Sequence, residues 1–247
     1  MMIKKILVSQ PKPTTEKSPY FEIEKKYGVK IDFRPLIHVE GLSPKEFRAQ
    51  KINILDYTAV VFNSRHAINF FFSLCKEMRI QIPETMKYFF ISEKVSLYVQ
   101  KYIQYRKRKV FFSEAGTWDD LVNLMLKHKK ERFFMPKSDV RKPEIAQSLG
   151  GLDLDFTEGT MYRTVSTIFD KKEPFDYDML VFFTPSGAIS LKDNFPDYKQ
   201  GDIKFGCFGD ATANKLEELG FRVDLKAPTA TSPSMTGAID EFLSKKK

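Results

Sequence analysis

The chain has 247 residues, of which 42% are hydrophobic and 23 are Phe, and this composition excludes a disordered protein. A chain of this length can form two domains of ordinary size, each with its own core. The formal net charge of +8 is typical either of a solubilising surface or of a protein with a negatively charged partner or substrate.

The cysteines and the hydropathy of the sequence indicate in which compartment the protein works. Cys75 and Cys207 are far apart and form no CxxC pattern, which predicts neither a disulfide framework nor a zinc site. They are typical of core thiols in a reducing cytosol. The first apolar run is too short for a signal peptide, and no segment approaches membrane-spanning length. We therefore expect a cytoplasmic protein that makes no membrane contact.

In chain order, the hydrophobic pattern predicts strands that alternate with helices. The expected strands are 3–9, 29–33, 58–62, 88–91, 109–112, 132–135, 152–156, 179–183, 204–208 and 221–225. The expected helices run from Thr15 to Gly28, from Ser43, through Cys75, over 93–102, from Thr117, over 143–149, from near Ala188, over 211–219 and over 235–243. Two further pieces, 35–39 and 160–165, look like extended crossings between domains. Strands alternating with helices imply parallel sheets with right-handed crossovers.

The stretch 179–190 combines a strand, a turn and a helix start. The apolar run from Met179 to Phe183 is typical of a strand buried on both faces of a parallel sheet. The turn that follows contains Thr184 and Ser186, which are both N-cap residue types, and then Gly187. Ligands bind at such positions in open α/β sheets, and free helix amides there favour anions. The alternative is a plain, well-capped turn.

A second copy of this pattern lies 121 residues earlier. Four identical residue pairs carry it, namely Val60/Val181, Phe62/Phe183, Ala67/Ala188 and Ile68/Ile189. The elements before and after match as well, so the chain contains a long internal repeat, and we expect two similar α/β units.

Catalytic motifs are scarce. The sequence contains no HExxH, GxSxG, P-loop or GxGxxG pattern, and its three histidines have no metal-ligand spacing, so we expect no metal and no cofactor. What remains are helix-start turns at the carboxyl ends of strands from both units. Their small hydroxyls and free amides suit carboxylates or phosphates; the candidate binding residues are Asn63, Ser64, Ser92, Thr184, Ser186, Gly187, Gly209, Ala211 and Thr212.

Several of these runs, in this order, resemble the uroporphyrinogen-III synthase family. They are 61–65, 162–164, 182–187 and Gly209 with Thr212-Ala213, and the resemblance covers the whole chain. It departs at Gly209-Asp210-Ala211-Thr212-Ala213, where the family usually has Gly-Pro-Thr-Thr-Ala or similar. It implies two similar α/β domains, each a parallel sheet flanked by helices, joined by a two-stranded extended linker. The first domain would comprise 1–35 with 168–247, the second 40–160, and the linker 34–39 and 157–167.

The implied reaction is cofactor-free closure of hydroxymethylbilane, with loss of water and inversion of the last pyrrole ring through a spiro intermediate. The eight carboxylates of this substrate fit the basic charge. Tyr162, on the second crossing segment, is the candidate acid for the departing hydroxyl group. We expect a monomer without a nucleic-acid partner. The alternatives are a non-enzymatic two-domain binder of an anionic small molecule, and a nucleic-acid-associated protein that uses the basic run 106–109.

Overall fold

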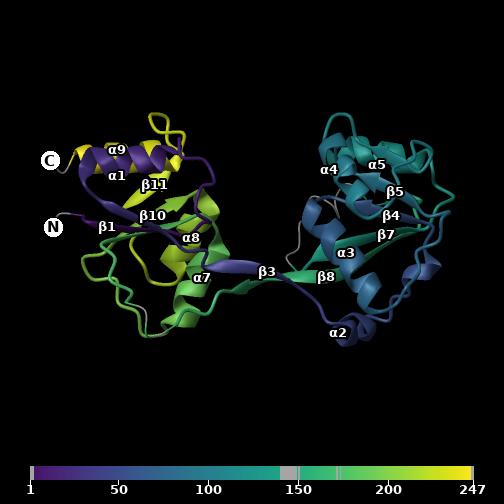
Figure 1. Cartoon of the computed structure of the whole chain (residues 1–247), viewed down its shortest axis with the longest axis horizontal. Coiled ribbons are helices and arrows are strands. Elements are labelled where there is room, and N and C mark those ends of the chain that lie inside the picture. Colours follow the sequence, from purple (N-terminus) through teal and green to yellow (C-terminus); the bar gives the residue numbers. More distant parts are fainter. Residues whose placement is uncertain (1–2, 140–148, 150, 171, 173, 246–247) are drawn as a thin grey trace. The chain divides into compact units, whose positions relative to one another are not determined.

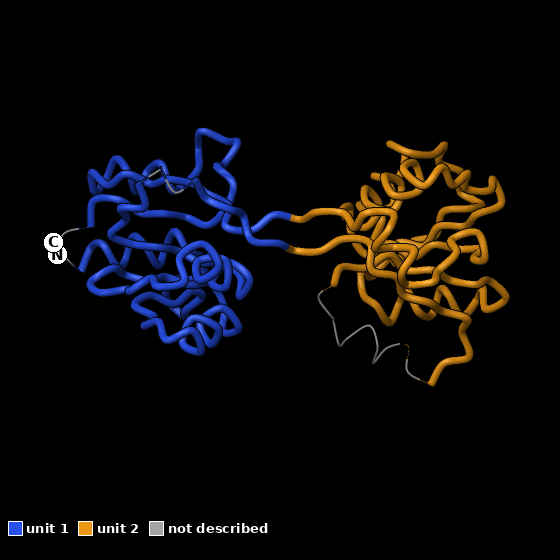
Figure 2. The backbone as a smooth tube through the Cα atoms, turned by 90° about the horizontal axis from the view of Figure 1, so that it is seen from below, with its two compact units in different colours: residues 1–38, 165–247 blue, residues 39–164 orange. Residues whose placement is uncertain are grey.

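A computed structural model describes residues 3–139, 149, 151–170, 172 and 174–245. Its contacts divide the chain into two compact units: unit 1 holds Met1–His38 and Val165–Lys247, and unit 2 holds Val39–Thr164 (Figure 2). The chain passes into unit 2 within strand β3 (Ile37–Gly41) and returns within β8 (Phe156–Ser166). The domain and linker boundaries expected from the sequence remain a prediction.

Unit 1 is built on a parallel sheet of five strands in the order β11-β10-β9-β1-β2 (Figure 1). The strands are β1 (Lys5–Val8), β2 (Lys30–Phe33), β9 (Met179–Phe182), β10 (Lys204–Phe208) and β11 (Leu225–Ala227). Every residue of β9 is buried, as its apolar run predicts for a central strand. Alternate side chains face opposite sides: Ile6 and Val8 pack with α1 (Pro19–Tyr27) and α9 (Met235–Ser244). Leu7 packs with α7 (Pro185–Asn194) and α8 (Asp210–Glu218).

Unit 2 is built on a sheet of six strands in the order β3-β8-β7-β4-β5-β6. From β8 to β6 the neighbouring strands are parallel. The remaining strands are β4 (Ala59–Phe62), β5 (Lys87–Phe90), β6 (Val110–Phe112) and β7 (Phe133–Ser138). The helical elements are α2 (Pro44–Ala49), η1 (Ile54–Asp56), α3 (Arg65–Glu77), α4 (Glu93–Tyr98), η2 (Val99–Lys101) and α5 (Trp118–Leu126). One face of the sheet packs on α2 and α3, and the other packs on α5.

The α/β class expected from the sequence is therefore confirmed, with two parallel-dominated sheets that carry helices on both faces. The repeat is visible in the structure, but its register differs by one residue. β4 ends at Phe62 and its helix is capped by Ser64, whereas β9 ends at Phe182 and its helix is capped by Thr184. The structural offset is thus 120, so Ser64 corresponds to Thr184 and not to Pro185.

Four expected elements are wrong or displaced. α7 begins at Pro185, not near Ala188, because Thr184 is its cap. α1 begins at Pro19 after Ser18, not after Thr15, because proline fits the first helical position. No strand covers 152–155: pairing with β7 starts at Phe156, and β8 then continues through the expected crossing piece to Ser166. β11 lies at Leu225–Ala227, not at 221–225, because Phe221 belongs to the α7–α8 core. The expected helix 143–149 falls mainly outside the described residues.

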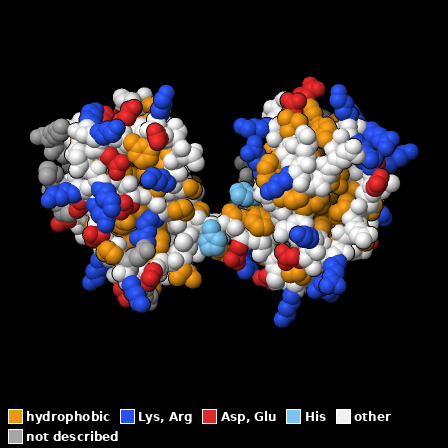
Figure 3. Space-filling model, viewed as in Figure 1, with side chains coloured by type: hydrophobic (Ala, Val, Ile, Leu, Met, Phe, Trp, Pro, Cys, Tyr) orange, Lys and Arg blue, Asp and Glu red, His pale blue; other side chains and the backbone are white. Residues whose placement is uncertain are grey.

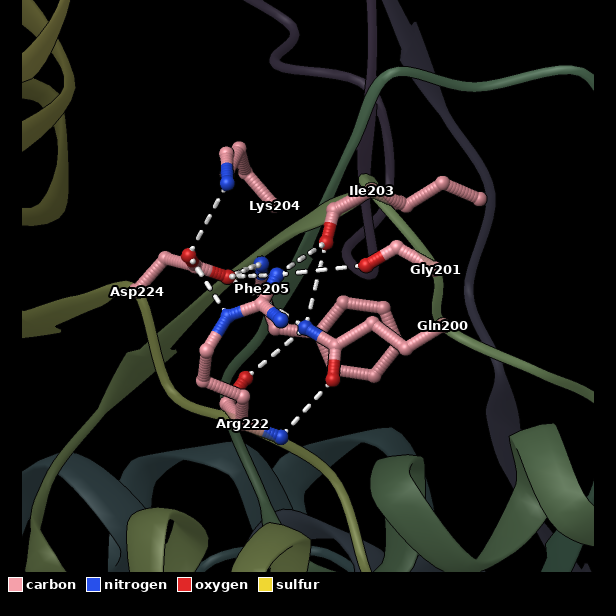
Figure 4. A network of polar contacts seen from close by, with 7 residues as sticks. All are labelled: Gln200, Gly201, Ile203, Lys204, Phe205, Arg222 and Asp224. Atoms are coloured by element: carbon pink, nitrogen blue, oxygen red, sulfur yellow. Dashed lines mark hydrogen bonds and ion pairs between the residues drawn. The ribbon is translucent and has the colours of Figure 1, made fainter.

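A polar network holds the amino-terminal edge of the unit 1 sheet (Figure 4). One oxygen of the Asp224 carboxylate accepts the Phe205 N–H at 3.0 Å, and the other accepts Arg222 Nε at 3.0 Å. Lys204 Nζ lies 3.3 Å from this carboxylate, and the Gln200 amide donates to it at 3.2 Å. The Gln200 side chain also donates to the carbonyls of Ile203 and Arg222 and accepts the Arg222 N–H, which completes the network. The charges at this edge are paired, which is typical of a structural role.

The Tyr198 hydroxyl is buried without a hydrogen-bond partner among the described residues. Its ring contacts Phe175, Phe195, Phe205 and Phe221. Tyr198→Phe is therefore expected to leave the free energy of unfolding unchanged or to raise it by about 1 kcal/mol, measured by urea denaturation. The matched control is Tyr177→Phe, which removes a hydroxyl that donates to Asp32 at 3.3 Å and should cost about 1 kcal/mol. A loss at Tyr198 as large as at Tyr177 would contradict the expectation.

Candidate functional site

In unit 1, the candidate residues lie where β9 and β10 end and their helices begin. These strands are neighbours in a parallel sheet, so their carboxyl ends share one edge. Thr184 caps α7, its hydroxyl accepting the Gly187 N–H at 3.1 Å. Ser186 is half-buried, and a Cβ on Gly187 would lie 3.9 Å from the hydroxyl of Ser9, which follows β1. The turn thus places three hydroxyl groups at one edge of the sheet.

The start of α8 differs from that of α7 because it has no side-chain cap. Gly209 is its N-cap, with φ of 82° that favours glycine, and its own N–H donates to Ala227 at 2.7 Å. The first backbone bond of the helix is Ala213 N–H to Gly209. Within the described ranges, no backbone or side-chain acceptor takes the N–H groups of residues 210–212. Three adjacent donors at the positive end of a helix form an arrangement that suits an anion.

Side chains around these amides differ in exposure. Ala211 is exposed, whereas Thr212 is 2% exposed, and its hydroxyl has no hydrogen-bond partner in the described part of the chain. Thr212 is therefore not the cap of its helix. The exposed Asp210 forms an ion pair with Lys226, and that hydrogen bond raises the pKa of Lys226. Lys226 thus offsets a carboxylate that would otherwise repel an anion from the amides.

In unit 2, Asn63 and Ser64 form the turn between β4 and α3. The Ser64 hydroxyl accepts the Ala67 N–H at 3.1 Å and so caps α3. The Asn63 Oδ1 atom is buried with no partner among the described residues. Ser92 occupies the N-cap position of α4, at the end of the neighbouring strand β5. Its side chain makes no capping hydrogen bond. The unit 2 candidates therefore also follow adjacent parallel strands.

Tyr162 lies on β8 in unit 2, near the side chain of Ser64. Burial raises the pKa of Tyr162, while the nearby Ser64 side chain opposes that shift. Its ring is stacked on Phe70 of α3, with centroids 5.1 Å apart and an interplanar angle of 18°. The fold thus brings the candidate acid close to one candidate binding residue, 98 positions away in the sequence.

Sequence reasoning missed two neighbours of this pair. Phe70 was not predicted as a site residue, because its position in the sequence is typical of ordinary helix packing. No sequence pattern indicates that it lies beside Tyr162. Arg65 is exposed beside Ser64, and its guanidinium lies 5.2 Å from the centroid of the Tyr98 ring. The described residues offer Arg65 no carboxylate partner. It therefore adds an available positive charge next to the Ser64 turn.

Among the described residues, no three His, Cys, Asp or Glu side chains gather in an arrangement that could hold a metal ion. None of the helices found in that part of the chain is long and apolar enough to span a bilayer.

The family model for uroporphyrinogen-III synthase HemD matches residues 20–237, most of the chain. The chain belongs to the uroporphyrinogen-III synthase family. Members of this family are cyclising lyases of tetrapyrrole biosynthesis that act on hydroxymethylbilane. The activity expected from the sequence is thereby confirmed, and the non-enzymatic binder is not favoured.

A solved uroporphyrinogen-III synthase structure shares this fold. The enzyme from Helicobacter pylori is similar with a TM-score of 0.57 and 14% identity, over 98% of this chain and 100% of that one. A mutant enzyme from the extremely thermophilic bacterium Thermus thermophilus gives a TM-score of 0.49 and 14% identity, over 99% of this chain and 100% of that one. A comparison with curated proteins found no match.

Proposed function

We propose that the carboxyl-edge turns of both units bind carboxylates of hydroxymethylbilane, and that Tyr162 protonates the departing hydroxyl group. The observation that carries the binding assignment is the start of α8, where three adjacent amides have no acceptor in the described residues. A carboxylate can bind at a helix N-terminus of this kind without displacing a capping side chain from the amides. In this assignment the turn at Gly209 presents the free amides of Asp210, Ala211 and Thr212 as ligands, helped by the Thr212 hydroxyl.

The remaining turns bind other carboxylates of the substrate, through groups that are weaker anion ligands than three adjacent free amides. Thr184 and Ser186 offer hydroxyls beside Gly187 in unit 1, and Asn63, Ser64 and Ser92 offer polar side chains in unit 2. Arg65 supports the unit 2 assignment, because an exposed guanidinium beside Ser64 is a natural partner for a carboxylate. Several small donors spread along two sheet edges suit a flexible substrate with eight carboxylates.

The proposed reaction requires no strong acid or base from the protein. As the Tyr162 proton moves to the hydroxyl group, the C–O bond breaks, water leaves, and the pyrrole nitrogen supplies the electron pair that forms the azafulvene. Attack by the substituted carbon of the last ring then gives the spiro intermediate, which fragments and recloses. A phenol is protonated at neutral pH and can donate, and burial, which raises the pKa of Tyr162, makes it a weaker acid that relies on the electron pair of the pyrrole. Positioning of the chain supplies the rest of the catalysis.

The decisive experiment is to incubate the protein with hydroxymethylbilane and identify the porphyrin isomer after oxidation. Spontaneous closure gives the symmetric I isomer, so predominance of the III isomer above a no-enzyme control is the expected result. Formation of only the I isomer at the uncatalysed rate would refute the proposed function for this chain.

Thr212→Val separates substrate binding from helix stability. Because Gly209 is the cap of α8, loss of the Thr212 hydroxyl removes no capping bond, and the melting temperature should stay within about 2 °C. The KM for hydroxymethylbilane should rise about fivefold, as for loss of one hydrogen bond of about 1 kcal/mol. Thr236→Val in α9, away from the β9 and β10 turns, is the matched control. A drop in stability without a change in KM would contradict the assignment.

We further propose that the protein works as a cytoplasmic monomer without a nucleic-acid partner. Both cysteines are free and buried, which supports a reducing compartment. Arg106, in the basic run, lies 3.6 Å from Glu84, and Figure 3 shows acidic side chains among the Lys and Arg of unit 1. Light scattering at working concentration and a gel-shift titration with duplex DNA test these two points. A dimer mass, or a shift that persists at about 150 mM salt, would overturn them.

A further inference from the structure

Strand β8 contains one extra residue directly before Tyr162. Its pairing with β7 runs without a break from Phe156 to Thr160 and then continues at Tyr162, so Met161 has no partner on β7. Consecutive side chains of a regular strand point to opposite faces of the sheet. Met161 and Tyr162 instead both lie in the core cluster that packs on α2 and α3. The extra residue is thus a bulge that turns Tyr162 onto the same face as Met161.

Without this bulge, Tyr162 would face the other side of the sheet. Phe156, at the start of β8, packs in the cluster of α5. A Cβ on Gly159 would lie 2.6 Å from the ring of Phe134, which belongs to the cluster of α2 and α3. The even-numbered residues at the start of β8 therefore face α5, and a regular strand would carry Tyr162 to that face, away from Phe70 of α3.

The side chain of Gln50, the C-cap residue of α2, holds the residue before the bulge. Its amide nitrogen donates to the Thr160 carbonyl at 2.7 Å, and its oxygen accepts the Thr160 N–H at 2.9 Å. A single carboxamide thus satisfies both backbone groups of Thr160, as a neighbouring strand would. The bulged residue itself is held by the Leu42 N–H, which donates to the Met161 carbonyl at 2.8 Å.

Arg163 holds the chain directly after Tyr162. Its Nε atom donates to Glu40 of β3 at 2.7 Å, and its Nη1 atom donates to Glu46 of α2 at 2.8 Å. The other oxygen of Glu46 accepts the N–H and the hydroxyl of Ser43 in the capping box of α2. The Arg163 side chain is 39% exposed, and ion pairs at such exposure contribute little to stability. Two carboxylates on one planar guanidinium instead fix its orientation.

We propose that Gln50 and Arg163 are positioning residues, which hold the bulge of β8 so that Tyr162 presents its phenol to the departing hydroxyl group. This inference rests on the proposed acid role of Tyr162. The proton passes from the phenol oxygen to the hydroxyl oxygen as the C–O bond breaks and water leaves, and this transfer depends steeply on where the donor lies. Because Gln50 and Arg163 act through Tyr162, their loss should lower kcat and leave KM unchanged.

The decisive experiment is a double-mutant cycle between Gln50→Ala and Tyr162→Phe, with formation of the III isomer from hydroxymethylbilane as the readout. Gln50→Ala alone should lower kcat about tenfold, with KM within about twofold. In the Tyr162→Phe background the same substitution should change kcat by less than about twofold, because no phenol proton remains to be positioned. An equal loss in both backgrounds, or an unchanged kcat in Gln50→Ala alone, would overturn the inference.

Gln200 of unit 1 provides the matched control. Its side chain makes the same pair of backbone bonds, donating to the Arg222 carbonyl at 2.9 Å and accepting the Arg222 N–H at 2.7 Å. Gln200→Ala should therefore lower the melting temperature at least as much as Gln50→Ala does, while kcat stays unchanged. A fall in kcat as large as that of Gln50→Ala would show a general effect of destabilisation, and the positioning role would be wrong.

Arg163 gives a second variant that does not depend on the folding of Gln50→Ala. Arg163→Gln should lower kcat about fivefold with a melting temperature within about 2 °C of the wild type, and Arg163→Lys, which keeps the charge, should lower it only about twofold. Full activity of Arg163→Gln would overturn the assignment of this residue. Full activity of Tyr162→Phe would instead overturn the proposed acid, and a wild-type protein that forms no III isomer would overturn the proposed function itself.

Discussion

Tyr162→Phe is expected to slow turnover by about ten- to a hundredfold, the low end for loss of a general acid. The loss is limited because the pyrrole itself supplies most of the driving force for departure of the hydroxyl group. The product should remain mainly the III isomer, since the inversion depends on how the substrate is held and not on the acid. Single-turnover kinetics with isomer analysis measures both quantities.

The pH dependence of the wild type gives an independent check on this role. Burial raises the pKa of Tyr162 above its ordinary value of 10.0. The phenol must be protonated to donate, so this group should impose no loss of activity between about pH 6 and 9, and activity should fall only on the alkaline side of about 10. The Phe variant should lack that alkaline limb.

The competing explanation is that Tyr162 only packs unit 2. Tyr57→Phe is the matched control, because Tyr57 lies in the same unit with its ring against Phe134. If Tyr162 only packs, its Phe variant should behave like the Tyr57 variant, with full activity. Full activity at both positions would remove the acid role, and unfolding of the Tyr162 variant would favour packing.

The sequence predicted the architecture well because the signals for it are local. The apolar run 179–182 and its counterpart 59–62 are buried at every position, as central parallel strands require. Ser64 and Thr184 cap their helices as their residue types predict. The offset of the repeat predicted from identical residue pairs was wrong by one residue. In the structure, the strand ends and helix caps of the two copies correspond at an offset of 120.

Errors occurred where long-range pairing decides the outcome. Residues 152–155 have a strand-like composition, but Phe133 N–H bonds to Asp155 and the ladder begins only at Phe156. Phe221 is apolar because it fills the α7–α8 core, not because it opens a strand. Such choices depend on partners distant in the sequence, which a local pattern does not contain.

The candidate site was predictable as a set of turns but not as a set of contacts. Parallel strands bring the carboxyl ends of β9 and β10 to one edge, which alternation alone implies. The proximity of Tyr162 to Ser64 depends on the register of β8, which shifts near Ser138. The Phe70 stack depends further on the missing side chain at Gly41. Neither follows from residue types at a fixed spacing.

Asp224→Ala is expected to lower the free energy of unfolding of unit 1 by about 3 kcal/mol. The Asp224 side chain is 12% exposed and accepts bonds from the Phe205 N–H, Arg222 and Gln200, with Lys204 close by (Figure 4). Its removal leaves these donors without their acceptor at the start of β10. Asp202→Ala removes an exposed carboxylate in the loop before β10; it is the matched control and should cost less than about 0.5 kcal/mol.

The readout must distinguish the two units. Trp118, the one tryptophan of the sequence, lies in α5 of unit 2, so its fluorescence serves as an internal reference. Amide hydrogen exchange of residues 204–208 reports β10 directly, and protection there should fall about a hundredfold in Asp224→Ala. Equal losses at β10 and at the Trp118 transition would contradict a local role for the network.

Acid titration tests the charge of Asp224 separately from its packing. Burial raises the pKa of Asp224, but hydrogen bonds from Arg222, the Phe205 N–H and Lys204 outweigh it, and the net pKa lies below 3.8. Because the folded pKa is lowered, the stability that the carboxylate contributes is present above pH 3.8 and is lost as pH falls through the folded value. The stability difference between wild type and Asp224→Ala should therefore shrink as the pH is lowered below 3.8. A difference that stays constant down to about pH 2 would show that the side chain acts by packing and not by its charge.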